Sequence, residues 1–284
     1  MGQWEWPLIL FTVLGQTAIG IIFCLWWLEH KREKTNTQPS AAYQSLVKTS
    51  VLTAGILLAV AMLSSVFHLG HPFVAYRALT HLSTSWLSRE ILLFVLTFMA
   101  WAYLFWQSTK SGGKLKGILG LTAGLGFLGI ISSALIYTLP RVPAWNNMGP
   151  IIFFLFTSVI LGALTTAMLG RKVLTEGETR QLLFLALGSV LVSFLLFILY
   201  MSLLGMSVEG AATAQYLMSS PLFWLRAFAG WILPLVLLFT MVLKKDKLQP
   251  NIILLIFSCG LIGELLGRAL FYVSAVGIQI TARI

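Results

Sequence analysis

The distribution of apolar residues restricts this chain to one class of fold. Eight blocks of roughly 20 mostly apolar residues follow one another, separated by short polar segments. A helix of about 20 apolar residues crosses the hydrocarbon core of a bilayer. Of the 284 residues, 58% are hydrophobic and 10% are charged, which is too little charge to cover the surface of a soluble domain. We therefore predict an all-α polytopic membrane bundle of eight transmembrane helices.

The gaps between the blocks leave no room for a soluble domain, so we treat residues 1–284 as a single transmembrane domain. The expected helices span about residues 7–29, 49–69, 89–108, 117–139, 150–170, 181–204, 221–243 and 251–275. The runs PLILF from Pro7 and PIIFF from Pro150 open the first and fifth helices. This similarity is compatible with a duplication of four helices, relating residues 1–140 to residues 141–284.

The basic residues predict the orientation of the helices. Thirteen Lys and Arg residues lie in or beside the first, third, fifth and seventh loops, against four in the other loops and the termini. Because basic residues collect on the cytoplasmic side, both termini are expected on the outer, periplasmic face. Nucleic-acid binding is not expected, since it would spread the basic residues over one surface.

Glycines recur at a spacing of four in two predicted helices. Gly120 and Gly124 lie in the fourth helix, and Gly263 and Gly267 lie in the eighth. Small residues at this spacing let helix backbones approach closely.

Five ionisable residues lie within the predicted helices or at their ends, where a charge is costly. They are His68, Glu90, Arg226, Glu264 and Arg268. The predicted topology places four of them toward the outer face, with Glu264 nearer the middle of the membrane. This one-sided distribution marks the outer half of the bundle as the candidate functional region.

Each of these residues also has a structural explanation. Glu264 and Arg268 are four residues apart and can form an ion pair on one helix face. Arg226 can extend its guanidinium to the lipid headgroups, and Glu90 suits the positive end of a helix dipole. His68 can be a core histidine bonded to a neighbour.

The segment that follows His68 favours a functional role for it. The loop carries further titratable and polar side chains, namely His71, Tyr76, Arg77 and His81, and Glu90 follows. Histidine exchanges a proton near neutral pH, and a nearby carboxylate can carry that proton onward. The segment therefore fits a proton-coupled reaction at the outer interface.

Resident redox cofactors are not expected in this chain. Cys24 and Cys259 are too few for an iron–sulfur cluster, which needs about four thiolates. Haem is not expected because only His68 lies within a predicted helix. A zinc site made of His68, His71 and His81 is conceivable, but no further ligand pattern supports it.

Three motifs lie far apart in the chain: WEWPLILFTVLGQ at the start, FHLGHPFVAYRAL followed by SREI, and GELLGRALFY near the end. Together they resemble the membrane-anchor subunit of dimethyl sulfoxide reductase, the DmsC family. The motifs occur in the family's order, and the length and helix number agree over the whole chain. Residues 100–250 match mainly in hydropathy.

The resemblance implies a non-catalytic subunit of an oxidoreductase complex in the bacterial inner membrane. Such a subunit anchors a molybdopterin catalytic subunit and an iron–sulfur electron-transfer subunit. It binds menaquinol near the periplasmic face and passes the electrons to the iron–sulfur subunit. The family associates its quinol site with the histidine of the HLG motif and the carboxylate before the third helix, which match His68 and Glu90.

We therefore expect His68 and Glu90 to handle the protons of menaquinol. Other polar and aromatic residues of the outer half are expected to form or support the pocket: His71, Arg77, Trp86, Arg226, Glu264 and Arg268.

Three alternatives stay open. An anchor of another quinol-linked molybdoenzyme, of the polysulfide or selenate reductase type, would share these features. A secondary transporter would predict a site at the membrane midplane and broken helices in both halves, whereas Pro234 is the main interior breaker here. A purely structural anchor would leave the placement of His68 and Glu90 unexplained.

Overall fold

The computed structural model describes residues 5–68, 80–110, 115–243 and 249–278, and the regular secondary structure of these ranges is helical throughout. Eight helical runs in these ranges are long and apolar enough to cross a membrane, which confirms the predicted number. Seven are single helices: α1 (Trp6–Lys34), α2 (Ala41–His68), α3 (Trp86–Ser108), α4 (Lys116–Leu135), α5 (Gly149–Gly170), α6 (Glu176–Leu204) and α10 (Pro250–Val273). The remaining crossing joins α8 (Pro221–Arg226), the π-helical turn η2 (Ala227–Ile232) and α9 (Leu233–Leu243).

The prediction of a loop between the sixth and seventh crossings was wrong. A short helix, α7 (Val208–Ser219), fills most of this segment. The side chain of Ser207 caps it by accepting a hydrogen bond from the backbone N–H of Gly210 at 3.1 Å. Thr213 and Leu217 are buried, and this packing stabilises a helix too short to be stable in isolation.

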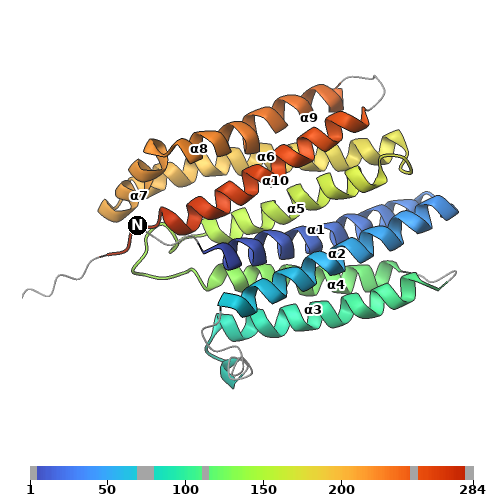
Figure 1. The fold of residues 1–284 in the computed structure, drawn as a ribbon, viewed down its shortest axis with the longest axis horizontal. Coiled ribbons are helices and arrows are strands. Elements are labelled where there is room, and N and C mark those ends of the chain that lie inside the picture. Colours follow the sequence, from blue (N-terminus) through green and yellow to red (C-terminus); the bar gives the residue numbers. More distant parts are fainter. Residues whose placement is uncertain (1–4, 69–79, 111–114, 244–248, 279–284) are drawn as a thin grey trace, which may run out of the picture.

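The crossings run side by side along the long axis of the bundle (Figure 1). Helix α1 lies at the centre, where it contacts α2, α4, α5 and α10, and 78% of its apolar window is buried. One buried cluster is built mainly from α1 to α4, and the other mainly from α5, α6 and α8 to α10. This arrangement in two groups of four is compatible with the predicted duplication, which stays a prediction.

The two ends of the bundle differ in their chemistry. We call the end at which α1 begins the N-terminal end, on the left of Figure 1, and the opposite end the basic end. Lys31, Arg32 and Lys34 fall in the last turn of α1, at the basic end. The periplasmic location of the N-terminal end stays a prediction that rests on the basic residues.

Two glycine pairs bring helix backbones into contact. A methyl group on Gly20 would overlap the backbone of α5 beside Gly162, and one on Gly263 would overlap the Cα atom of Gly230. The predicted close approach at Gly263 is therefore confirmed. The prediction at Gly124 was wrong, because nothing lies within 4 Å of the position that its Cβ would take.

The π-helical turn η2 has a local cause. Pro234 lies two residues after its last residue, Ile232, and a proline lacks the N–H that would bond the carbonyl four residues earlier. A π-helical turn can absorb this missing bond, and such turns often occur at functional sites. Here the turn comes immediately after Arg226, one of the buried charges.

Candidate functional site

A pocket lies toward the N-terminal end of the bundle, among α5, α6, α8 and α10. Its empty space, including the part open to solvent, is about 680 Å³. Seven aromatic side chains line it: Trp145, Phe153, Phe154, Phe197, Tyr200, Phe223 and Phe271. Its polar wall includes Thr157, Arg226, Glu264 and Arg268. An apolar pocket with a few converging polar groups is typical of a small-molecule site.

The structure brings three of the predicted residues into this one pocket. Arg226 comes from the end of α8, and Glu264 and Arg268 come from α10. Their side chains are buried, with exposed fractions of 8%, 9% and 5%. The burial of Arg226 excludes the interpretation that it extends to the lipid headgroups.

Thr157 of α5 connects Glu264 to Arg268. Its hydroxyl has two acceptors, Glu264 Oε2 at 2.5 Å and the backbone oxygen of Phe153 at 2.9 Å, and it accepts a hydrogen bond from Arg268 Nη2 at 3.3 Å. Arg268 Nη2 also donates to Gln16 Oε1 of α1 at 2.8 Å. Among the contacts of the described residues, the two charges therefore meet through a threonine hydroxyl rather than as a direct ion pair.

The two arginines keep unused donors. Nε and Nη1 of Arg226 and Nε of Arg268 are buried and have no hydrogen-bond partner in the described part of the chain. The guanidinium of Arg226 lies 3.7 Å from the ring centroid of Trp231, and that of Arg268 lies 3.6 Å from the centroid of Phe154. Unpaired charged donors are costly to bury, so a ligand with acceptor oxygens would stabilise this arrangement.

Gly267 makes room for Arg226. A methyl group at position 267 would overlap the Nε atom of Arg226. The predicted small-residue pair of α10 therefore has two uses: Gly263 admits a helix backbone, and Gly267 admits a charged side chain.

A second polar group lies between the pocket and α3. Tyr137 and Tyr272 are linked through their hydroxyl oxygens at 2.9 Å. Glu90 of α3 is 5% exposed, with the Ser133 hydroxyl as its hydrogen-bond partner. Both Glu90 and Arg268 interact electrostatically with the two tyrosines. Glu90 thus does not line the pocket, but it shares the tyrosine pair with Arg268 as an electrostatic neighbour.

The other predicted residues either do not line the pocket or lie outside the described part of the structure. Trp86 is 39% exposed, and its ring carries the guanidinium of Arg89 at 4.2 Å, so it does not line the pocket. His68 is the last residue of α2, and its side chain is outside the described part of the structure. His71 and Arg77 lie outside the described residues altogether.

Four residues of this region were not predicted from the sequence: Gln16, Tyr137, Thr157 and Tyr272. Single threonines, tyrosines and glutamines give no periodic or motif signal within an apolar block. The available signal was their position in the same half of the bundle as the five ionisable residues.

Comparison with known proteins agrees with the whole-chain resemblance. The family model described as "DMSO reductase anchor subunit (DmsC)" matches residues 1–273. The sequence is 28% identical to the YnfH subunit of anaerobic dimethyl sulfoxide reductase of Escherichia coli K12, and 26% identical to the C subunit of anaerobic dimethyl sulfoxide reductase from the same organism. Each comparison covers 95% of both proteins. It is 32% identical to the C subunit of the Haemophilus influenzae enzyme, over 58% of this protein and 57% of that one. The protein therefore belongs to the DMSO reductase anchor subunit family, DmsC.

Proposed function

We propose that this chain oxidises menaquinol in the aromatic pocket and passes the electrons to an iron–sulfur subunit. The family makes the chain a multi-pass membrane anchor of a dimethyl sulfoxide reductase-type enzyme. The quinol chemistry, the molybdopterin partner and the location in the bacterial inner membrane with the pocket near the periplasmic face belong to the proposal.

The observation that carries the proposal is the pair of buried arginines with unused donors in an aromatic pocket. A quinol has a flat ring that can pack among aromatic side chains. Its two oxygens are acceptors for the free N–H groups of Arg226 and Arg268. A guanidinium would also stabilise the negative charge that develops on an oxygen as its proton leaves.

The reaction breaks two O–H bonds of the quinol and releases two protons and two electrons. The electrons leave to the iron–sulfur subunit. Glu264, the carboxylate of the pocket wall, is placed to accept a proton. Glu90 is proposed to relay protons toward the N-terminal end. His68, the last residue of α2, lies at that end and is proposed to take part in this transfer.

His71, Arg77 and Trp86 stay predicted contributors to the outer part of the site. Trp86 is the first residue of α3 and is not a wall of the pocket. Menaquinol itself is proposed from the family resemblance, because the pocket is compatible with any quinol ring of similar size.

The test compares two electron donors with the assembled complex. In a Glu264→Gln variant, the rate driven by a soluble menaquinol analogue should fall by about 100-fold, the usual contribution of a positioned acid–base group. The rate driven by an artificial dye that reduces the iron–sulfur subunit directly should be unchanged. His68→Leu should show the same selective loss.

Glu209→Gln is the matched control, because this carboxylate lies in the first turn of α7, outside the pocket. The proposal fails if Glu264→Gln and His68→Leu complexes, fully assembled, oxidise the quinol analogue at the wild-type rate.

A further inference from the structure

A second pocket lies at the basic end, far from the aromatic one. It is formed where α1 ends, α2 begins, α3 ends and α4 begins. Its empty space, including the part open to solvent, is about 1550 Å³. Four cationic side chains line it: Arg32, Lys48, Lys110 and Lys116. Two carboxylates, Glu29 and Glu33, lie in the same lining, so cations outnumber acids.

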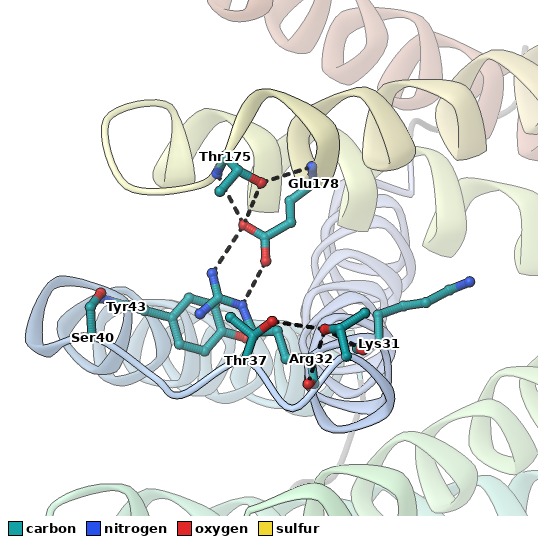
Figure 2. A network of polar contacts seen from close by, with 8 residues as sticks. Lys31, Arg32, Thr37, Ser40, Tyr43, Thr175 and Glu178 are labelled. Atoms are coloured by element: carbon teal, nitrogen blue, oxygen red, sulfur yellow. Dashed lines mark hydrogen bonds and ion pairs between the residues drawn. The ribbon is translucent and has the colours of Figure 1, made fainter.

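Arg32, which lines this pocket, is held in a network of polar contacts (Figure 2). Its Nε and Nη2 atoms donate to the two carboxylate oxygens of Glu178 at 2.6 Å and 3.0 Å. Glu178 is held in turn by Thr175 in a capping box at the start of α6. The guanidinium also lies 3.4 Å from the ring centroid of Tyr43. Arg32 therefore ties α1 to α2 and α6, and its charge is already compensated.

The two lysines Lys48 and Lys110 are not compensated in this way. Lys116 contacts the carboxylate of Glu33, and Glu29 lies beside Arg32, with which it interacts electrostatically. No carboxylate pairs with Lys48 or Lys110 within the ranges that the structure describes.

Two helix N-termini add to the positive potential. The pocket lining includes Tyr43 and Gln44 near the start of α2, and Leu115 and Lys116 at the start of α4. The first turns of both helices contain no acidic residue, and the side chain of Leu115 provides no cap. At the start of α2 the Ser40 hydroxyl accepts a hydrogen bond from the Tyr43 N–H at 3.2 Å, so one N–H group of that terminus is already capped. The positive end of a helix dipole favours an anion at both termini.

Aromatic side chains indicate that this pocket lies at the level of the lipid headgroups. Trp106 and Tyr103, in the last two turns of α3, are 52% and 49% exposed. The ammonium of Lys110 lies 3.2 Å from the ring centroid of Trp106. Exposed tryptophan and tyrosine at a helix end are typical of the membrane–water interface. The phosphate abundant at that depth is the phosphodiester of a lipid.

We propose that this pocket binds the headgroup of an anionic phospholipid, with the phosphate between Lys48 and Lys110. The side chains of Thr37, Gln38 and Ser108, which also line the pocket, supply hydrogen bonds for the hydroxyls of a glycerol headgroup. The site lies at the opposite end of the bundle from the aromatic pocket, and it does not depend on quinol chemistry.

The experiment uses the complete enzyme complex, purified in a detergent that strips bound lipid. It is titrated with short-chain phosphatidylglycerol, with short-chain phosphatidylethanolamine and with inorganic phosphate, and binding is followed by thermal shift and native mass spectrometry. The double variant Lys48→Gln, Lys110→Gln is compared with Arg171→Gln, Lys172→Gln. The control pair is exposed and lies where α5 ends, so it removes the same charge from the same end of the bundle.

We expect phosphatidylglycerol to bind the wild-type complex, and the Lys48, Lys110 variant to bind it about 25-fold more weakly, roughly fivefold for each lysine. The control pair should leave binding within about twofold. Equal weakening by both variants would overturn the site. Equal binding of phosphatidylethanolamine would overturn its preference for anionic lipid, and equal binding of inorganic phosphate would make it a site for free anions.

Discussion

The Thr157 hydroxyl offers a sharp test of how the aromatic pocket is held together. Thr157→Val keeps the shape of the side chain and removes the hydroxyl group. That hydroxyl hydrogen-bonds to Glu264 and accepts a hydrogen bond from Arg268. Glu264 is 9% exposed, so the change removes a hydrogen-bond donor from a largely buried carboxylate. A hydrogen bond to a charged group contributes about 1.5–3 kcal/mol. At about 1.4 kcal/mol for each factor of ten, this corresponds to a loss of about 10- to 150-fold in kcat/KM.

Thr165→Val is the matched control for this prediction. Thr165 lies on the same helix and is 3% exposed. Within the described residues its hydroxyl has the backbone oxygen of Leu161, at 2.6 Å, as its only acceptor, whereas Thr157 has Glu264 in addition to a backbone oxygen. The Leu161 oxygen keeps its helical hydrogen bond, so the change should leave kcat/KM within about threefold.

The assay is the steady-state oxidation of a soluble menaquinol analogue by the purified complex, with dye-driven turnover measured in parallel to confirm assembly. If Thr157→Val and Thr165→Val give the same kcat/KM for the quinol analogue, the coupling of Glu264 and Arg268 through Thr157 has no part in quinol oxidation.

Two further predictions concern packing and charge. In Gly267→Ala the new methyl group would overlap the guanidinium of Arg226 and displace it, so KM for the quinol analogue should rise by about tenfold. Gly124→Ala, with nothing near its Cβ, should leave this KM unchanged. Equal KM values for the two variants would refute the prediction. Glu178→Gln breaks a bidentate ion pair whose side chains are 12% and 15% exposed, and should lower the thermal denaturation temperature of the complex by several degrees. Lys116→Gln breaks the ion pair with Glu33, whose side chains are 37% and 64% exposed for Lys116 and Glu33. It should change the thermal denaturation temperature by about 1 °C or less, which calorimetry can measure.

The number of crossings was predictable from the sequence because apolar length alone determines it. The sequence also indicated that Arg226, Glu264 and Arg268 lie near one another, because alternating helix directions place these positions in the same half of the membrane. The order in which the helices pack was not predictable. Faces toward lipid and faces toward protein are both apolar, so hydropathy does not show which helix meets which.

The details of the pocket depend on that packing order. Thr157, Thr165 and Thr166 are all buried threonines of α5. Thr157 differs from the other two because it contacts Glu264 of α10, which lies 107 residues later in the sequence. Likewise the pairing of Tyr137 with Tyr272 joins residues 135 positions apart.

The failed prediction at residues 208–219 has a different cause. Its polar residues, Glu209, Thr213, Gln215 and Ser219, interrupt the apolar pattern between two apolar blocks, and Ser207 was not recognised as a helix cap. The burial of Thr213 and Leu217 against the bundle, which the sequence does not reveal, decides the outcome.

Quinol oxidation is proposed to take place in the pocket among α5, α6, α8 and α10. The most direct measurement is photo-crosslinking of the intact complex with an azido-quinone analogue, with and without excess menaquinol analogue, followed by mass spectrometry of the labelled peptides. We expect labels that the competitor removes at pocket residues such as Phe153, Tyr200 and Phe271. Competitor-sensitive labels confined to α2 and α3, with none in α5, α6 or α10, would contradict the account.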